Sequence, residues 1–462
     1  MTGSVLGVFC PFWSNEGPHF VLPHFQGMLH AVGVDASVLD LNIDCAETLA
    51  EEWQSLSENQ GGLWSDPDRV AALLDYSGLT ERLLAVIADR HPSWVAFLGV
   101  NVASYQVVRE LLRCVRVVYP AGHPRLAVGG PICLHLDDGG QALFPDADLV
   151  WLGTIEAALP LLTDGQVPAV SGYVLPRFRP DFSGILMERY TRPERLTYLL
   201  NYGCRFKCRF CHEGSQYRRE IARPALGLAR ELRAVIAGLP TVRYIRFFDS
   251  SFNSNHSQFL DILDEFTGAG LFWGCYLTPT RRIDSEVARR MAMSGCLGVN
   301  IGVESGSSGV RRLMAKPSPD IEVVEACLWA LASAGLDLSI NLIVGYPGES
   351  ERDVDETLSF LDRSAHLLSD VAVGKAGIYA GTPLFEDACS RGIELGGHSS
   401  REFVFNHWRL SDGSNTPEIR ASRLRRIEAH LMDLGFPNAR SESAPDPGRR
   451  ALQLRGSARC AE

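Results

Sequence analysis

The chain lacks the features that mark several classes of protein. None of its apolar runs approaches the roughly 20 residues that a membrane-spanning helix needs. Residues 1–17 have no basic stretch ahead of an apolar one, so we expect no signal peptide and a cytoplasmic protein with no membrane partner. The formal net charge of −11 argues against a nucleic-acid partner, because phosphate binding needs a basic face.

A fourth cysteine is missing from the segment NYGCRFKCRFCHEG, residues 201–214. Structural zinc sites use four ligands, and disulfides need an even number of cysteines in an oxidising compartment. Cys204, Cys208 and Cys211 satisfy neither need, although a partial zinc site or a chance spacing stays an alternative. Three thiolates can hold three irons of a [4Fe–4S] cluster and leave one iron open. Three neighbouring cations are expected to help keep these thiols ionised: Arg205, Lys207 and Arg209.

The 462 residues allow two or three domains, and the pattern changes near residue 170. In the first part, short apolar runs alternate with helical patterns, which predicts parallel strands and a doubly wound, Rossmann-like α/β sheet. The expected strands of this sheet are 4–9, 34–40, 94–100, 125–130 and 148–153.

The second part repeats strand and helix about six times, which predicts a partial (β/α)6 barrel with its chemistry at the carboxyl ends of the strands. The expected strands are 196–201, 243–248, 271–277, 297–303, 338–345 and 371–379. Two helix starts are legible: Ser318 as an N-cap, and Ser350 with Asp353 as a capping box. We divide the chain into a Rossmann-like domain (1–170), a linker (171–189), the barrel (190–395), a small helical C-terminal extension (396–440) and a disordered tail (441–462).

The spacing Cys204-x3-Cys208-x2-Cys211, with Phe210 before the last cysteine, resembles the signature of the radical SAM superfamily. The resemblance implies that S-adenosylmethionine (SAM) chelates the open iron and is cleaved to methionine and a 5′-deoxyadenosyl radical. An electron donor of the flavodoxin or ferredoxin type would then be a partner.

The same resemblance implies SAM contacts at later strand ends. Asp249 and Ser250 fall where relatives bind the methionine amino group, and Glu304 and Ser305 fall where they bind ribose or methionine. Asn341 and Ile343 fall where relatives contact adenine, and the sixth strand ends near Tyr379. Taken singly, each of these segments is also an ordinary turn between a strand and a helix. The implied SAM-binding residues are Phe210, Asp249, Ser250, Glu304, Ser305, Asn341, Ile343 and Tyr379.

The first domain resembles the cobalamin-binding domain that precedes the barrel in one radical SAM class. The resemblance rests on Gly129, Gly130 and Gly153, because glycines after a parallel strand let a ligand approach the backbone. The Asp-x-His-x-x-Gly motif that supplies an axial histidine is missing, and Thr154 and Ile155 add bulk where relatives have a bare backbone. We therefore favour a vestigial domain, with cobalamin binding as the alternative.

Tyr217 lies six residues past Cys211, where a phenol can donate a proton to a leaving hydroxyl or stack on the loop. With the degenerate first domain, it makes the chain resemble radical SAM diol dehydratases of aminoglycoside biosynthesis. The resemblance implies dehydration of a paromamine-like sugar diol, with a separate NADPH-dependent reductase taking the ketone. A cobalamin-dependent radical SAM C-methyltransferase is the second hypothesis, and a non-catalytic binding protein with the same fold is the third.

Overall fold

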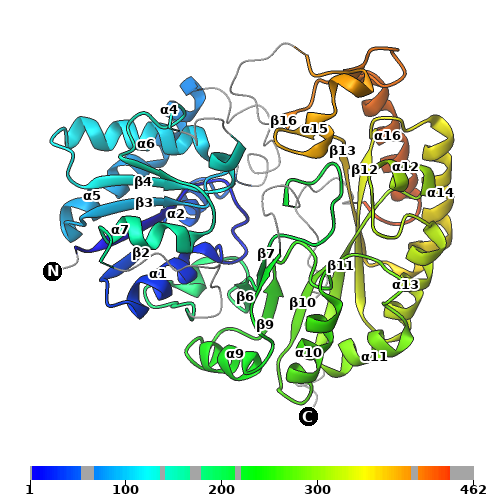
Figure 1. Ribbon diagram of the computed structural model, residues 1–462, viewed down its shortest axis with the longest axis horizontal. Helices are drawn as coiled ribbons and strands as arrows, with labels where there is room; N and C mark the ends of the chain where they lie inside the picture. Colours follow the sequence, from blue (N-terminus) through cyan, green and yellow to red (C-terminus); the bar gives the residue numbers. More distant parts are fainter. Residues whose placement is uncertain are drawn as a thin grey trace. The chain divides into compact units, whose positions relative to one another are not determined.

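Two parallel sheets organise the chain (Figure 1). The computed structural model describes residues 3–51, 53, 67–135, 141–166, 178–213, 220–396 and 404–437. The chain divides into one compact unit of Met1–Thr197 with Ala234–Val242, and a second of Tyr198–Arg233 with Arg243–Glu462. No helix within these described ranges is long and apolar enough to cross a membrane.

The sheet of the first unit has five parallel strands in the order β2-β1-β3-β4-β5. They are β1 (Val5–Phe9), β2 (Ala36–Asp40), β3 (Trp94–Leu98), β4 (Arg125–Gly129) and β5 (Leu149–Trp151). Both β1 and β3 are buried along their whole length, as expected for strands covered on two faces. The predicted doubly wound sheet is therefore confirmed.

Helices cover both faces of this sheet, with α4 and α6 on one side and α1 and α7 on the other (Figure 1). The helices are α1 (Val21–Ala31), α2 (Leu41–Thr48), α4 (Pro67–Ser77), α5 (Leu79–Arg90), α6 (Tyr105–Val118) and α7 (Leu159–Leu162). The core beneath α1 joins Phe25 to Phe9 and Trp151, so the last strand of the sheet packs against its first helix.

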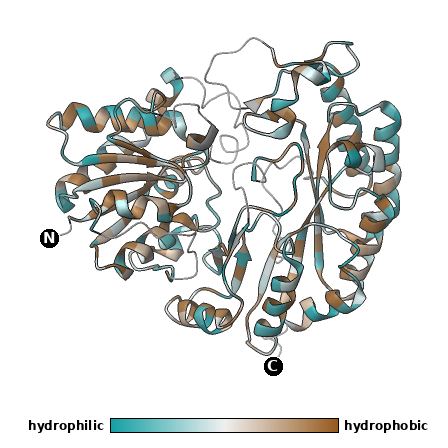
Figure 2. Cartoon of the chain, viewed as in Figure 1, coloured by the Kyte–Doolittle hydropathy of each residue, from teal (hydrophilic) through white to brown (hydrophobic). Residues whose placement is uncertain are grey.

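The sheet of the second unit has six strands in the order β13-β12-β11-β10-β9-β6. They are β6 (Arg195–Tyr198), β9 (Tyr244–Phe247), β10 (Trp273–Leu277), β11 (Cys296–Glu304), β12 (Asp337–Val344) and β13 (Asp370–Lys375). Neighbouring strands from β9 to β13 pair in parallel, which confirms the predicted partial barrel. Hydrophobic residues run along the strands of both sheets in Figure 2.

Helices follow the strands of the second unit in turn. They are α9 (Leu228–Ala237), α10 (His256–Phe266), α11 (Ser285–Met293), α12 (Ser308–Leu313), α13 (Ile321–Ser333), α14 (Glu351–Ser364), α15 (Pro383–Glu386) and α16 (Pro417–Asp433). Ser350 and Asp353 form the predicted capping box at the start of α14. The prediction for Ser318 is wrong, because α13 begins at Ile321 after Asp320.

Short strands also pair outside the two large sheets. They are β7 (Asn201–Tyr202), β8 (Ile221–Ala222), β14 (Ile378–Tyr379), β15 (Ile393–Glu394), β16 (Val404–Phe405) and β17 (Arg409–Leu410). β7 pairs with β8, β14 with β16, and β15 with β17, each antiparallel. The segment that holds β16, β17 and α16 falls in the predicted C-terminal extension, and α16 contacts β12 and β13.

An aromatic cluster holds α10 against the sheet. Trp273 on β10 lies 5.9 Å from Phe266 and 5.3 Å from Phe252, measured between ring centroids, and Phe252 also contacts Phe259. The indole N–H of Trp273 donates to the carbonyl of Ser294, so its polar atom is satisfied inside the core.

This cluster predicts a large loss of stability for Phe259→Ala. Phe259 is fully buried on α10, so its removal should lower the unfolding free energy by about 3–5 kcal/mol. The matched control is Trp329→Ala on α13, whose side chain is 59% exposed and whose loss should change that free energy by less than about 0.5 kcal/mol. Urea denaturation measures both, and equal effects would contradict the described packing.

Candidate functional site

The three cysteines lie on a loop that follows β7 directly. The loop is joined to distant elements by backbone hydrogen bonds at Arg209, whose N–H donates to the Met314 carbonyl after α12 and whose carbonyl accepts from Leu384 on α15, both at 2.9 Å. The guanidinium of Arg209 also pairs with Asp387. The predicted position of the cysteines, just past the first strand of the barrel, is therefore confirmed.

Burial dominates the protonation of these thiols. It raises the pKa of Cys204 to about 11 and that of Cys211 to about 12. Burial also raises the pKa of Cys208, with the charges of Lys316 and Arg311 acting in the opposite direction. Metal ions replace the thiol proton when they bind cysteine, so these buried cysteines are expected to become thiolates when metal ions bind to them.

The cations predicted to ionise these thiols are engaged elsewhere in two cases. Arg205 pairs with Glu220 at 2.7 Å, and Arg209 pairs with Asp387. Both guanidinium groups therefore have a carboxylate partner, and their help in ionising the thiols stays a prediction. The cations that act on Cys208 come instead from the segment after β11, which the spacing within the loop does not reveal.

An iron–sulfur cube and a single metal ion require different arrangements of the three thiols. In the described ranges, no three His, Cys, Asp or Glu side chains are arranged to hold one ion. A cube places each thiolate on a different iron, so its ligands need not converge on one point. Two of the three thiols are also acted on by the charge of another, since Cys208 acts on Cys204 and both act on Cys211.

Asp249 faces inward rather than into open space. Its carboxylate accepts the backbone N–H of Asn201 at 2.6 Å and of Leu200 at 3.2 Å, so it holds the connection that leads to the cysteine loop. Burial raises the pKa of Asp249 to about 7. The neighbouring Ser250 is exposed, and its side chain hydrogen-bonds to the carboxyl group of Glu213, a residue that sequence reasoning missed.

Glu304 ends β11 in the left-handed region, with φ at +69°. Its carboxylate pairs with Lys316 at 3.1 Å, and both side chains are almost fully buried. The Lys316 ammonium lies 6.0 Å from the centre of the Phe210 ring. Glu304 and Phe210 are thus connected through Lys316, which lies twelve positions past Glu304 in the sequence and which no strand-end motif marks.

Ser305 turns toward the helices. Its hydroxyl accepts from the N–H of Ser307 at 3.1 Å and lies 3.4 Å from the hydroxyl of Thr357 on α14. This side chain is 1% exposed, so its observed partners are those of a turn. Asn341 is likewise paired, because its amide donates to the Asn300 amide oxygen at 2.8 Å.

Two predicted residues, Phe210 and Ile343, come together, and Tyr379 lies near the cysteine loop. Phe210 and Ile343 pack against the same buried cluster, which includes Met314, Tyr346, Leu384 and Trp408. Tyr379 is 40% exposed, and its ring lies 6.1 Å from that of His212, which follows Cys211. Tyr217 lies outside the described residues.

The glycines predicted for cobalamin are covered by the chain itself. A Cβ on Gly129 would lie 1.9 Å from the Trp151 ring, and one on Gly130 would lie 2.1 Å from the backbone N of Val100. Thr154 and Ile155 are buried, while Gly153, at φ +103°, meets only Ala157 within 4 Å. The packing of the chain itself therefore requires glycine at 129 and 130, and their role as a cobalamin contact stays a prediction.

Comparison with known families agrees with the cysteine loop. Residues 198–361 match the model of the Radical SAM superfamily. The chain carries a radical SAM domain. It is 24% identical over 217 residues to a bacteriochlorophyllide d C-12(1)-methyltransferase of Chlorobaculum tepidum, covering 46% of this chain and 47% of that one. It is 30% identical over 171 residues to a tRNA-2-methylthio-N(6)-dimethylallyladenosine synthase of Koribacter versatilis, covering 35% and 38%.

The chain spans about half or less of the length of these curated relatives, whereas two solved structures match nearly all of it. The radical SAM methyltransferase TsrM from Kitasatospora setae, solved with cobalamin and a [4Fe–4S] cluster, has a TM-score of 0.65 at 15% identity, covering 95% of this chain and 92% of that one. OxsB, solved with aqua-cobalamin and SAM, has a TM-score of 0.61 at 14% identity, covering 99% and 61%. At these identities, the radical SAM domain and the sheet domain before it share a fold with both.

The inward-facing Asp249 predicts a pH-dependent contribution to stability. In the folded chain the pKa of Asp249 is about 7, above the value of about 4 expected in the unfolded chain. The folded chain therefore holds this proton more tightly, and its stability falls as the pH rises from about 4 to about 7. Relative to Asp249→Asn, which keeps an oxygen acceptor without the titration, the wild type should lose stability between about pH 5 and about pH 8. Urea denaturation at both pH values measures this, and a pH-independent difference would contradict it.

Proposed function

We propose that the chain is a radical SAM enzyme that holds a [4Fe–4S] cluster through Cys204, Cys208 and Cys211. The observation that carries the proposal is the loop itself, which presents three buried or half-buried thiols at the superfamily spacing and lies within the matched residues. When bound, the cluster supplies the electron that cleaves SAM to methionine and a 5′-deoxyadenosyl radical.

The chain's own residues would position SAM beside this loop. Ser250 offers an exposed hydroxyl at the end of β9, held by Glu213. Ile343 and Phe210 offer an apolar surface from one shared cluster, which suits the adenine ring. Glu304 and Lys316 form a buried ion pair, and the Lys316 ammonium lies near the Phe210 ring. We assign this pair the role of supporting the apolar surface that Phe210 and Ile343 form. Asp249 acts by holding the connection before the cysteine loop.

The comparisons favour methyl transfer as the reaction. One curated relative is a carbon methyltransferase, and a solved structure that covers most of both chains is that of a radical SAM methyltransferase with cobalamin bound. We therefore propose methylation of a small-molecule carbon as the first candidate. Such a reaction spends one SAM on the radical and takes its methyl group from another, so it requires a methyl carrier such as cobalamin.

Dehydration of a sugar diol is the second candidate, and the covered glycines favour it. Trp151 and Val100 occupy the space that a Cβ on Gly129 and Gly130 would need, so the packing of the chain accounts for these two glycines without a bound cobalamin. The radical would then take hydrogen from a carbinol carbon of a paromamine-like aminoglycoside, the neighbouring hydroxyl would leave as water, and Tyr217 would donate the proton. A flavodoxin- or ferredoxin-type donor would supply one electron for SAM cleavage and a further electron that, with a proton, converts the resulting radical into the deoxy-ketone. A separate NADPH-dependent reductase would then take the ketone.

Cluster binding predicts that Cys208→Ala abolishes SAM cleavage. After anaerobic reconstitution the wild type should contain about four irons per chain and release 5′-deoxyadenosine on reduction. The matched control is Cys389→Ala, because Cys389 is exposed and lies outside the loop. The control should keep both iron and cleavage. A Cys208→Ala variant that released 5′-deoxyadenosine at the wild-type rate would refute the assignment.

Product mass and cobalamin binding separate the two reactions. The wild type is incubated with paromamine-type substrates, SAM and reductant, with and without hydroxocobalamin. Methyl transfer predicts tight, stoichiometric cobalamin binding and a product heavier by one methylene group. Dehydration predicts turnover without cobalamin and, after the ketone is reduced, a product lighter by one oxygen atom. Mass spectrometry decides between them, and cluster-dependent SAM cleavage with neither product would remove this substrate class.

A further inference from the structure

The turn between β12 and α14 is the segment on which this inference rests. Gly345 adopts φ of +78°, and its N–H donates to the Glu349 carboxylate at 2.7 Å, so the turn closes on itself. The turn starts after Val344, the last residue of β12, and contains Tyr346. Tyr346 belongs to the buried cluster against which Ile343 and Phe210 pack. Any shift of this turn therefore moves the apolar surface that we propose for adenine.

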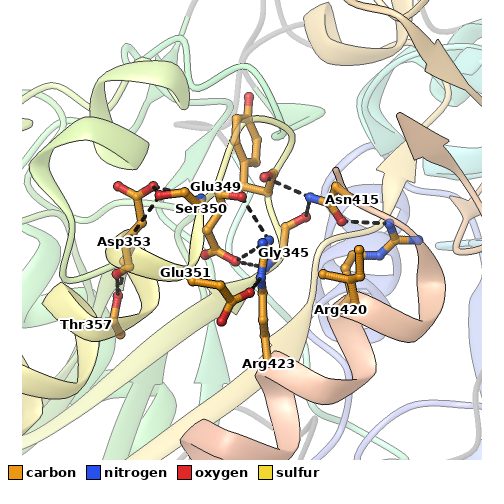
Figure 3. A network of polar contacts seen from close by, with 12 residues as sticks. Gly345, Glu349, Ser350, Glu351, Asp353, Thr357, Asn415, Arg420 and Arg423 are labelled. Carbon is orange, nitrogen blue, oxygen red and sulfur yellow. Dashed lines mark hydrogen bonds and ion pairs between the residues drawn. The ribbon is translucent and has the colours of Figure 1, made fainter. Parts of the chain in front are cut away.

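The C-terminal extension binds the carbonyl side of this turn. The side-chain amide of Asn415 donates to the carbonyls of Gly345 at 3.1 Å and Tyr346 at 3.3 Å, as Figure 3 shows for the labelled residues. Arg420 on α16 donates to the Asn415 side-chain oxygen at 3.2 Å and to the Trp408 carbonyl at 2.7 Å. Its guanidinium also stacks over the Trp408 ring at 3.9 Å.

Arg420 and Gly345 are matched in shape. A Cβ on residue 345 would lie 2.3 Å from the Cγ of Arg420 and 2.6 Å from its Cδ, so the arginine stem fills the space that the glycine leaves. This position thus requires glycine for its φ angle and for the close approach of α16. The aliphatic part of the Arg420 side chain makes this contact, while its guanidinium donates hydrogen bonds to Asn415 and Trp408.

Arg423 binds the far end of the same turn (Figure 3). It donates to the Glu349 carbonyl at 2.9 Å, lies 3.5 Å from the Glu349 carboxylate, and pairs with Glu351 at 2.7 Å. The side chains of Arg423 and Glu349 are only 5% and 3% exposed, so this pair is shielded from water. Buried charge-assisted hydrogen bonds of this kind are strong and strict in geometry.

We propose that α16, through Asn415, Arg420 and Arg423, is a positioning element that holds the β12–α14 turn in the conformation that binds the adenosine part of SAM. The inference rests on the proposed function, because it assigns the turn to SAM. These residues act through the turn and touch no reacting atom. Removing them leaves the cysteines in place but lets the turn relax, so SAM affinity falls while cluster content is kept.

The test compares two arginines of the same helix. Arg423→Met removes the contact with the turn, whereas the matched control Arg426→Met removes a charge that is 45% exposed and pairs with Asp355 and Glu351. Binding of SAM to each reconstituted protein is measured by equilibrium dialysis, and iron content and the EPR spectrum of the reduced cluster are recorded in parallel. Arg423→Lys, which keeps the charge, serves as the conservative variant.

Arg423→Met should bind SAM about tenfold more weakly than the wild type, Arg423→Lys should recover part of that loss, and Arg426→Met should bind as the wild type does. All three should keep the iron content and the cluster spectrum. Should Arg423→Met fail to fold, Asn415→Ala replaces it and should weaken SAM binding in the same direction. Wild-type affinity in the soluble Arg423→Met or Asn415→Ala protein would overturn the inference. Failure of the wild type itself to bind SAM would overturn the proposed function with it.

Discussion

The cysteine loop depends on one pair of backbone hydrogen bonds, those of Arg209 with Met314 and Leu384. The loop starts beside the first strand of the six-stranded sheet, whereas its two partners follow β11 and β14. The bonds therefore carry the loop across to the later elements of the barrel. That placement brings Cys208 within the influence of Lys316 and sets Phe210 on the cluster that also receives Ile343. The backbone of the chain thus fixes the position of the cysteine loop.

The buried acids at the strand ends act mainly on the scaffold. Asp249 accepts backbone N–H groups before the cysteine loop, Glu304 pairs with Lys316, and Glu349 closes the turn that α16 holds. Burying a carboxylate is costly unless it is paired or hydrogen-bonded, and each of these has such partners. The result is a preorganised surface around the cysteines, to which SAM and a substrate would add their own polar groups.

The local parts of this account could be predicted from the sequence. Strand and helix alternation predicts both sheets, and the cysteine spacing predicts the loop and its chemistry. Features set by distant partners could not be predicted. Arg311 donates to the carbonyls of Ser318 and Pro319, so this stretch cannot start α13 at Ser318. Trp151 covers Gly129, and Thr357 lies beside Ser305. In both cases the partner is distant in the sequence, so the residues around Gly129 and Ser305 do not predict it.

The central claim is that the three cysteines leave one iron of the cluster open for SAM. Electron–nuclear double resonance of the reduced, reconstituted protein with SAM labelled at the methionine amino nitrogen tests this directly. The account predicts a resolved coupling between that nitrogen and the cluster, because chelation joins it to the open iron. A fully loaded cluster that shows no such coupling under saturating SAM would contradict the account.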